Sequence, residues 1–217
     1  PPDLPHYFIE RFTQPGDTVL DPFSGRGTTA VEAAAQGRIG ICNDLNPLAI
    51  ALSRGKLSNP EKSDVLNRLA ELKSQYNPED FRTFRGVNKD IRFIYHINTL
   101  RQLVYLKQEL DWRKPGVDAF IVAVLMGAMH GSSPGFLSLP MPNTASWSPT
   151  YIRKYVREHG LECPDRDAFG VLEERINRML KLGKLHGSGK AHDVDVRKIG
   201  EKLEPGSVKL LFTSPPY

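Results

Sequence analysis

Two short stretches of the chain have residue types and spacings that suit chemistry, and the first is DPFSGRGTT, which starts at Asp21. Gly25 and Gly27 let the backbone approach a ligand closely because neither carries a side chain. The helix that begins near Thr28 offers free N–H groups to a carboxylate or phosphate. Asp44 follows about 20 residues after Asp21, where a carboxylate can accept both hydroxyls of a ribose. The stretch predicts a site for a nucleoside-containing ligand.

The remaining residues of this stretch favour S-adenosylmethionine over a dinucleotide. Nicotinamide enzymes use GxGxxG, whose third glycine packs the helix against the strand, and Ala30 stands at that position here. Phe23 precedes the glycines and offers an aromatic face to a cofactor that carries a cation. The alternative interpretation is a tight turn with a core phenylalanine and no ligand.

The motifs point to one enzyme family. DPFSGRGTT followed by NDLNPLA resembles the cofactor half of the amino-methylating DNA methyltransferases, and TSPPY, residues 213–217, resembles their catalytic motif. The resemblance covers about residues 1–56 and 193–217. It implies methyl transfer from S-adenosylmethionine to N4 of cytosine or N6 of adenine, with double-stranded DNA as the partner.

The resemblance also implies roles for single residues of the cofactor site. Asp44 is expected on the ribose, Asp195 near the adenine, and the helix from Leu4 to Phe12 at the methionine end. The residues expected to contact the cofactor are Asp21, Phe23, Ser24, Gly25, Gly27, Thr28, Asp44, Leu45 and Asp195.

The second stretch, SPPY, suits the methylation of an exocyclic amine, whose delocalised lone pair makes it a poor nucleophile. The Ser214 hydroxyl and the Pro215 carbonyl can accept hydrogen bonds from the amine and orient it, and the fixed φ angles of Pro215 and Pro216 hold these acceptors rigidly. Tyr217 offers a face on which a flipped base can stack. A proline-rich turn that only closes a strand is the alternative.

The first motif position favours cytosine. Among relatives a serine there is typical of cytosine N4 enzymes and Asp or Asn of adenine N6 enzymes, and this chain has Ser214. A cytosine C5 enzyme is disfavoured because it needs a thiolate, and Cys163 lies in the expected helical insertion, far from the catalytic motif in sequence.

The composition is that of an ordinary globular protein. The 217 residues are 40% hydrophobic and 25% charged, and the formal charge of +4 favours a polyanionic partner. The two cysteines lack CxxC spacing, and the histidines form no metal-binding pattern, so we expect no metal and a reducing, cytoplasmic location. No apolar run is long enough to cross a bilayer, and the start of the chain shows no signal peptide.

The order of the elements predicts an α/β fold with a Rossmann-like, mostly parallel methyltransferase sheet. Residues 1–57 are expected to form its cofactor-binding half, residues 58–189 a mostly helical insertion, and residues 190–217 the second part of the sheet. Strands are predicted at 18–20, 39–44, 193–196 and 207–213. A flexible connector at 181–190 is expected before the last two of them.

Four strands fall short of the seven that such sheets normally hold. The strands that would follow TSPPY are missing, so we expect either a missing C-terminal segment or a partner chain to complete the sheet.

The insertion is the expected target recognition region. Its irregular stretch 130–150 and the segment MPNTASWSPTYIRKY, residues 141–155, combine aromatic and basic side chains that suit DNA contact. A solvated helix face is the alternative for any single cation. Two further hypotheses for the whole protein are a methyltransferase for RNA or protein amines and a non-catalytic DNA-binding module.

Overall fold

The computed structural model describes residues 2–79, 87–133, 135–141 and 147–215. Its contacts divide the chain into two compact units. The first unit comprises Pro1–Glu61, Asp111–Ala123 and Leu180–Tyr217, and the second comprises Lys62–Leu110 and Val124–Met179. Residues 111–123 thus group with the first unit although they lie inside the expected insertion, and the three-part domain division stays a prediction.

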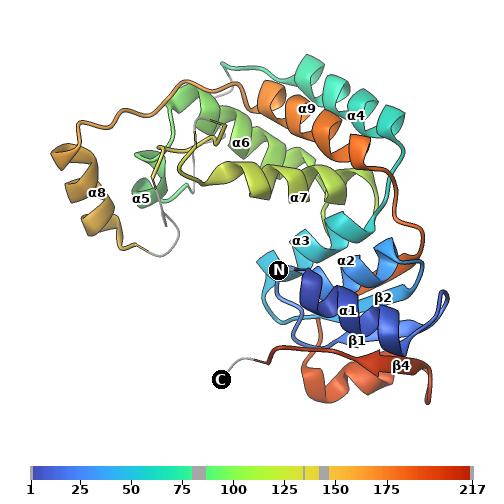
Figure 1. Ribbon diagram of the computed structural model, residues 1–217. Coiled ribbons are helices and arrows are strands. Elements are labelled where there is room, and N and C mark those ends of the chain that lie inside the picture. The colour runs from blue at the N-terminus through green and yellow to red at the C-terminus, as the bar shows by residue number, and fades with distance from the viewer. Residues whose placement is uncertain (1, 80–86, 134, 142–146, 216–217) are drawn as a thin grey trace. The chain divides into compact units, whose positions relative to one another are not determined.

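The first unit contains a four-stranded, wholly parallel sheet in the order β3-β2-β1-β4, which confirms the predicted α/β class. Its helices α1 and α2 lie on one side of the sheet (Figure 1). The elements of this unit are α1 (Asp3–Phe12), β1 (Thr18–Asp21), α2 (Thr28–Ala35), β2 (Ile39–Asn43), α3 (Pro47–Leu57), η2 (Leu180–Leu182), β3 (Ser188–His192), η3 (Val196–Lys202) and β4 (Val208–Leu211).

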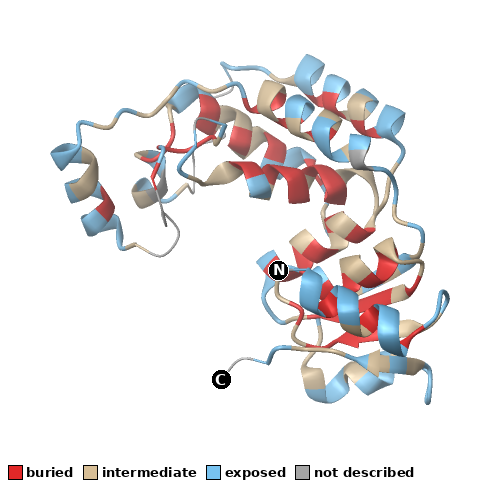
Figure 2. Ribbon diagram, in the orientation of Figure 1, coloured by how far each residue is buried: buried red, intermediate tan, exposed pale blue. Residues whose placement is uncertain are grey.

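Small residues allow α2 to lie directly on the sheet. Ala30 and Ala34 are fully buried against Cys42 in one cluster, and a second cluster joins Val19 to Ala33 and to Ile9 of α1. Figure 2 shows buried positions on the strands and on the helices packed against them. The start of α2 is thereby brought to the sheet edge where β1 ends.

The third strand lies earlier in the chain than predicted. Residues 188–192 pair with β2, whereas residues 193–196 form a turn and the start of η3, so the strand predicted at 193–196 is wrong. Gly187 and Gly189, interpreted as a flexible connector, are instead needed for close approach. A Cβ on Gly187 would lie 2.1 Å from the Arg38 carbonyl oxygen, and one on Gly189 would lie 2.6 Å from that of Gly40.

The second unit is helical, as predicted for most of residues 58–189. In it α9 packs against both α4 and α6 through buried side chains such as Leu72, Leu106 and Phe169. Its helices are α4 (Lys62–Gln75), α5 (Lys89–Arg92), α6 (Ile97–Glu109), α8 (Pro149–Glu158) and α9 (Ala168–Met179), and α7 (Val117–Met129) runs from the first unit into the second.

The expected irregular stretch at 130–150 is confirmed in its described parts up to Ser148, and its last two residues belong to α8. Residues 135–141 form no helix or strand, yet Leu137, Leu139 and Met141 are fully buried. The Leu139 N–H donates to the Ile94 carbonyl at 2.8 Å, which fixes the chain beside the start of α6. In the described part of the chain, none of the helices is both long and apolar enough to cross a membrane.

Replacing Gly40 with alanine should destabilise the first unit. The new Cβ would lie 2.0 Å from the Ala30 carbonyl oxygen, so α2 would have to move off the sheet. We expect Gly40→Ala to lower the free energy of unfolding by about 1–3 kcal/mol in urea titrations. In the matched control Gly127→Ala, the Cβ meets no atom within 4 Å and the glycine is helical, so the change should be within about 1 kcal/mol and stabilising. Equal effects would contradict this packing.

The contact between α1 and α2 should depend on pH. The hydrogen bond from His6 Nδ1 to Glu32 Oε1, 2.7 Å long, raises the pKa of His6 above its ordinary value of 6.5. The folded state then binds this proton more tightly than the unfolded state, so the stabilisation is complete below pH 6.5 and is lost as the pH rises through the folded pKa. Glu32→Gln should return the pKa of His6 toward 6.5 in an NMR titration of its ring protons, and an unchanged value would contradict the pairing.

Candidate functional site

The carboxyl ends of the four parallel strands bring the predicted motifs to one edge of the sheet. From β1 the chain continues to β2 and β3 on one side, whereas β4 pairs with β1 on the other side. The strand order therefore reverses between β1 and β4, and in open α/β sheets ligands bind outside the carboxyl ends at such a point. Asp21 ends β1, Asp44 follows β2, and Thr213 follows β4.

The loop after β1 is held by backbone contacts with the end of β2. The Ser24 N–H donates to the Asn43 carbonyl at 3.0 Å, and Gly25 adopts a φ of 49°. A Cβ on Gly25 would meet nothing within 4 Å, whereas one on Gly27 would lie 2.5 Å from Ser53 Oγ. Gly27 is thus required by packing against α3, and the space beside Gly25 is open to a ligand.

Asp44 is oriented by two backbone donors, one on each carboxylate oxygen. Oδ2 accepts from the Gly25 N–H at 2.9 Å and Oδ1 accepts from the Asn46 N–H at 2.8 Å. A carboxylate has about four lone-pair sites, so each oxygen keeps about one for a further donor. That geometry suits two neighbouring hydroxyl groups.

The start of α2 suits an anionic group. Gly27 occupies the N-cap position with a φ of 74°, and no side chain caps this helix end. Its first N–H groups therefore lack an intrahelical partner, and Thr28 beside them is exposed. Phe23 is half-buried at the same edge. The glycine loop, the helix start and Asp44 together form a cradle whose donors and acceptors fit an amino-acid carboxylate and a ribose.

Asp21 joins the first motif to the last one. Its buried carboxylate accepts at Oδ1 from the Thr213 hydroxyl at 2.7 Å and from the Phe23 N–H at 3.2 Å. The Phe212 N–H donates to the Leu20 carbonyl at 3.0 Å, so the chain is still paired with β1 immediately before TSPPY. The first residue of TSPPY is therefore in direct contact with the loop DPFSGRGTT.

The other residues of the catalytic motif are described in part. Ser214 and Pro215 are exposed at the sheet edge, beyond the Thr213 hydrogen bond. Pro216 and Tyr217 lie outside the described residues. The roles predicted for all four stay predictions.

Two further predicted residues flank the cradle. Leu45 is 69% exposed directly after Asp44 and offers an apolar surface. The Asp195 side chain caps η3 by accepting from the Arg197 N–H at 3.0 Å, and the Arg197 guanidinium beside it lowers the pKa of that carboxyl. The cofactor roles of Leu45 and Asp195 stay predictions.

Asn43 was missed by the sequence analysis. Its side chain is 99% buried and links the segments that follow β1, β2 and β3. Nδ2 donates to the Pro22 carbonyl at 3.3 Å and to the Val194 carbonyl at 2.9 Å, and Oδ1 accepts from the Val194 N–H at 3.1 Å. The only signal in the sequence is an amide placed before Asp44 at the end of an apolar strand.

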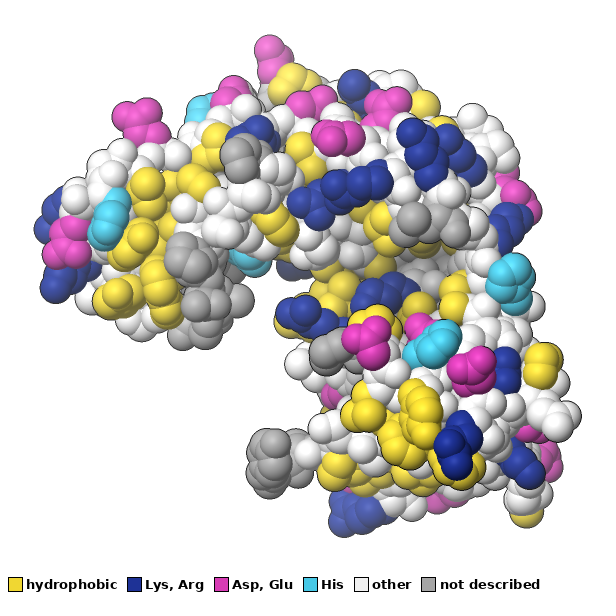
Figure 3. All heavy atoms as spheres, in the orientation of Figure 1, with side chains coloured by type: hydrophobic (Ala, Val, Ile, Leu, Met, Phe, Trp, Pro, Cys, Tyr) yellow, Lys and Arg dark blue, Asp and Glu magenta, His cyan; other side chains and the backbone are white. Residues whose placement is uncertain are grey.

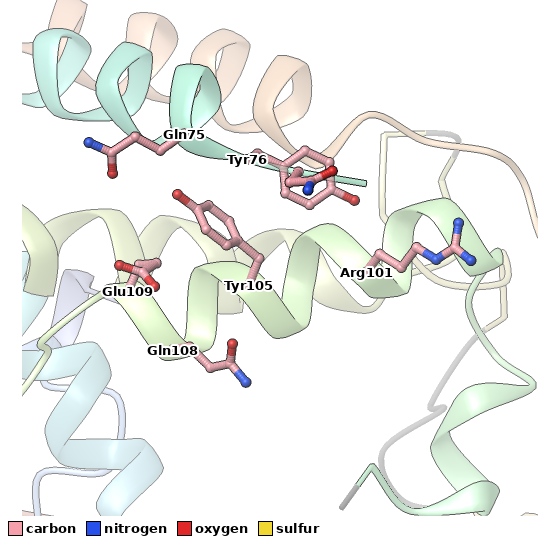
Figure 4. Close-up of a pocket in the computed structure, with 7 residues that line it drawn as sticks. Gln75, Tyr76, Arg101, Tyr105, Gln108 and Glu109 are labelled. Carbon is pink, nitrogen blue, oxygen red and sulfur yellow. The ribbon is translucent and has the colours of Figure 1, made fainter. Parts of the chain in front are cut away.

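One pocket in the described residues lies apart from this site, in the second unit. It has a volume of about 110 Å³ between the end of α4 and α6 (Figure 4). Its lining comprises Gln75, Tyr76, Asn77, Arg101, Tyr105, Gln108 and Glu109, none of which belongs to the predicted site.

Comparison with known proteins agrees with the motifs. Residues 1–54 match the DNA methylase family. The resemblance to amino-methylating DNA methyltransferases, of N6 or N4 type, is thereby confirmed for the segment that holds β1, α2 and β2. No solved structure matches the chain significantly.

Curated relatives are type II methyltransferases. M.MjaII of Methanocaldococcus jannaschii is 30% identical over 37% of this chain and 16% of its own length. M.PvuII of Proteus hauseri is 32% identical over 32% of this chain and 22% of its own length. M.BglI of Bacillus subtilis is 50% identical over 23% of this chain and 14% of its own length. The chain thus spans less than a quarter of the length of these curated relatives.

Replacing Asn43 with aspartate should loosen the edge of the sheet. A carboxylate still accepts from the Val194 N–H but leaves the Pro22 and Val194 carbonyls without their donor. At pH 7 we expect Asn43→Asp to lower the free energy of unfolding by about 2 kcal/mol or more.

The pH dependence and a matched variant provide controls. The carbonyl oxygens raise the pKa of the introduced carboxyl, so its protonated form regains a donor and the deficit should shrink as the pH falls from 7 to 5. In Asn46→Asp the new side chain still caps α3 by accepting from the Leu48 N–H, so stability should be nearly unchanged. A pH-independent loss, or equal losses in both variants, would contradict this role of Asn43.

Proposed function

We propose that the protein is a site-specific, S-adenosylmethionine-dependent DNA methyltransferase that modifies the exocyclic amine of a flipped base, with cytosine N4 favoured. The observation that carries this proposal is the hydrogen bond from Thr213 to Asp21, which joins the first residue of TSPPY to the glycine loop at the switch point of the sheet. The match of residues 1–54 to the DNA methylase family supports it.

The cofactor would be held by the cradle at the ends of β1 and β2. The two remaining acceptor sites of Asp44 suit the ribose hydroxyls, the start of α2 suits the carboxylate, and the open side of Gly25 leaves room for the chain between them. The other proposed contacts are made by Asp21, Phe23, Ser24, Gly27, Thr28, Leu45 and Asp195. When bound, S-adenosylmethionine supplies an electrophilic methyl group on a positively charged sulfur.

The acceptors of the catalytic motif would act on the amine. The hydroxyl of Ser214 and the carbonyl of Pro215 are exposed and therefore open to an incoming base. Hydrogen bonds from the amino group to these oxygens would orient its lone pair and take up the positive charge that develops on nitrogen. Pro216 and Tyr217 are proposed to hold this geometry and to stack on the flipped base.

Several finer assignments belong to the same proposal. Ser214 favours cytosine, with adenine N6 as the alternative, and RNA amines or a non-catalytic DNA-binding role remain the rival functions. Double-stranded DNA is the proposed substrate, and the cytoplasm is the proposed location of the protein. A further segment or a partner chain is proposed to complete the sheet beside β4.

Cofactor binding should depend on Asp44. The variant Asp44→Asn keeps the shape of the side chain but removes its charge and one acceptor, so calorimetric titration with S-adenosylmethionine should show affinity about 10- to 100-fold weaker. The matched control Asp193→Asn neutralises an exposed carboxylate at the end of β3 and should leave affinity unchanged.

Two results would overturn the proposal. Absence of S-adenosylmethionine binding would contradict the cofactor, and binding without methylation by the full-length protein would favour a non-catalytic module. Mass analysis of nucleosides from treated DNA and RNA would distinguish N4-methylcytosine from N6-methyladenine and DNA from RNA as substrate.

A further inference from the structure

Helix α8 and the residues next to its two ends present four aromatic side chains spaced four residues apart, which we call the aromatic ladder: Trp147, Tyr151, Tyr155 and His159. The Trp147 ring lies 4.8 Å from that of Tyr151 and 5.3 Å from that of Tyr155, between ring centroids. Tyr155 stacks on His159 at 3.9 Å, and His159 Nδ1 lies 2.9 Å from the Tyr155 carbonyl oxygen. The rings therefore support one another and form a continuous surface.

The ladder faces outward because the other side of α8 is already engaged. Ile152 is buried, and Arg153 reaches α5, where it pairs with Asp90 at 3.0 Å and lies over the Phe93 ring at 4.1 Å. On the ladder side, Tyr151 is 49% exposed and His159 is exposed, and Trp147 and Tyr155 are half-buried. Figure 3 shows the hydrophobic patch over α8, with Lys and Arg side chains at its border.

The surroundings of the ladder are basic. Helices α5 and α8 carry five cationic side chains, namely Lys89, Arg92, Arg153, Lys154 and Arg157, against the two carboxylates Asp90 and Glu158. Asp90 pairs with Arg153 and Glu158 with Lys154, so both carboxylates are already neutralised. The ladder thus combines ring faces with excess positive charge.

We propose that α8 binds single-stranded nucleic acid by stacking unpaired bases on the aromatic ladder, while the cations of α5 and α8 contact the phosphates. Rings next to cations are the combination by which proteins hold single strands, because every base has a face that can stack. The inference deepens the proposed function and rests on it for the identity of the strand as DNA, since an enzyme that flips a base must handle unpaired nucleotides.

The composition of this surface favours a nucleic acid over a second copy of the chain. The exposed residues of α8 carry three cations against one carboxylate, which favours a polyanionic partner; they are Pro149, Thr150, Tyr151, Arg153, Lys154, Arg157 and Glu158. Excess positive charge would also repel an identical surface.

The test measures the binding of a fluorescein-labelled oligo-dT 12-mer and of a duplex of equal length. Tyr151→Ala should weaken binding of the single strand by about tenfold, the equivalent of one lost stacked base, and leave the duplex nearly unchanged. Tyr151→Phe keeps the ring and should restore binding. The matched control Ile97→Ala removes an apolar side chain that is 48% exposed in the same unit, and should change neither affinity.

Tryptophan fluorescence gives a second readout that does not depend on substitution in the ladder. The chain has two tryptophans, so Trp112→Phe leaves Trp147 as the sole indole. Oligo-dT should then quench the emission of Trp147, and Arg157→Ala should reduce the salt dependence of binding.

Three outcomes would overturn the inference: no binding of the single strand, an equal loss for single strand and duplex in Tyr151→Ala, or unquenched Trp147. A dimer that dissociates in Tyr151→Ala without change in DNA affinity would assign the ladder to a second copy. Titration with S-adenosylmethionine and nucleoside analysis report on the cofactor site and the catalytic motif, which lie outside the aromatic ladder. A failure of the proposed function would therefore be distinguished from a failure of this inference.

Discussion

The geometry of the candidate site depends on one buried carboxamide. Three segments leave the sheet at the carboxyl ends of β1, β2 and β3. The Asn43 side chain bonds to the first through the Pro22 carbonyl and to the third through both polar backbone groups of Val194. An amide is suited to this position because it donates and accepts while uncharged. This one buried group therefore links the segments that carry the glycine loop, Asp44 and Asp195.

Close backbone packing is the second constraint. Helix α2 can bring its first N–H groups to the edge of the sheet only because Gly40 has no Cβ, which would clash with the Ala30 carbonyl oxygen. The same applies to β3, which joins the sheet through Gly187 and Gly189. These glycines do not touch the proposed ligand, yet they set how near the helix and the outer strand come to it. Residues far from the cradle thus decide its shape.

Local patterns in the sequence predicted the strands and helices whose own residues have the composition typical of that element. The apolar run before Asp21, the alanine-rich helix after Gly27 and the run before Asp44 correspond to β1, α2 and β2. β3 was misplaced because SGKAH has neither apolar alternation nor β-branched residues, and its strand conformation comes from pairing with β2. The roles of Asn43 and Thr213 were also beyond local patterns, since their partners Val194 and Asp21 are 151 and 192 residues away along the chain.

The carboxylate of Asp21 explains why the first and last motifs occur together. One oxygen, Oδ1, holds the Phe23 N–H of the glycine loop and the Thr213 hydroxyl of TSPPY. The carboxylate is buried, so water cannot replace either donor without cost. A ligand that shifts the glycine loop would therefore also shift Thr213, and by linkage a base held by the residues after Thr213 would act back on the loop. Cofactor and base are thus expected to influence each other's binding through the carboxylate of Asp21.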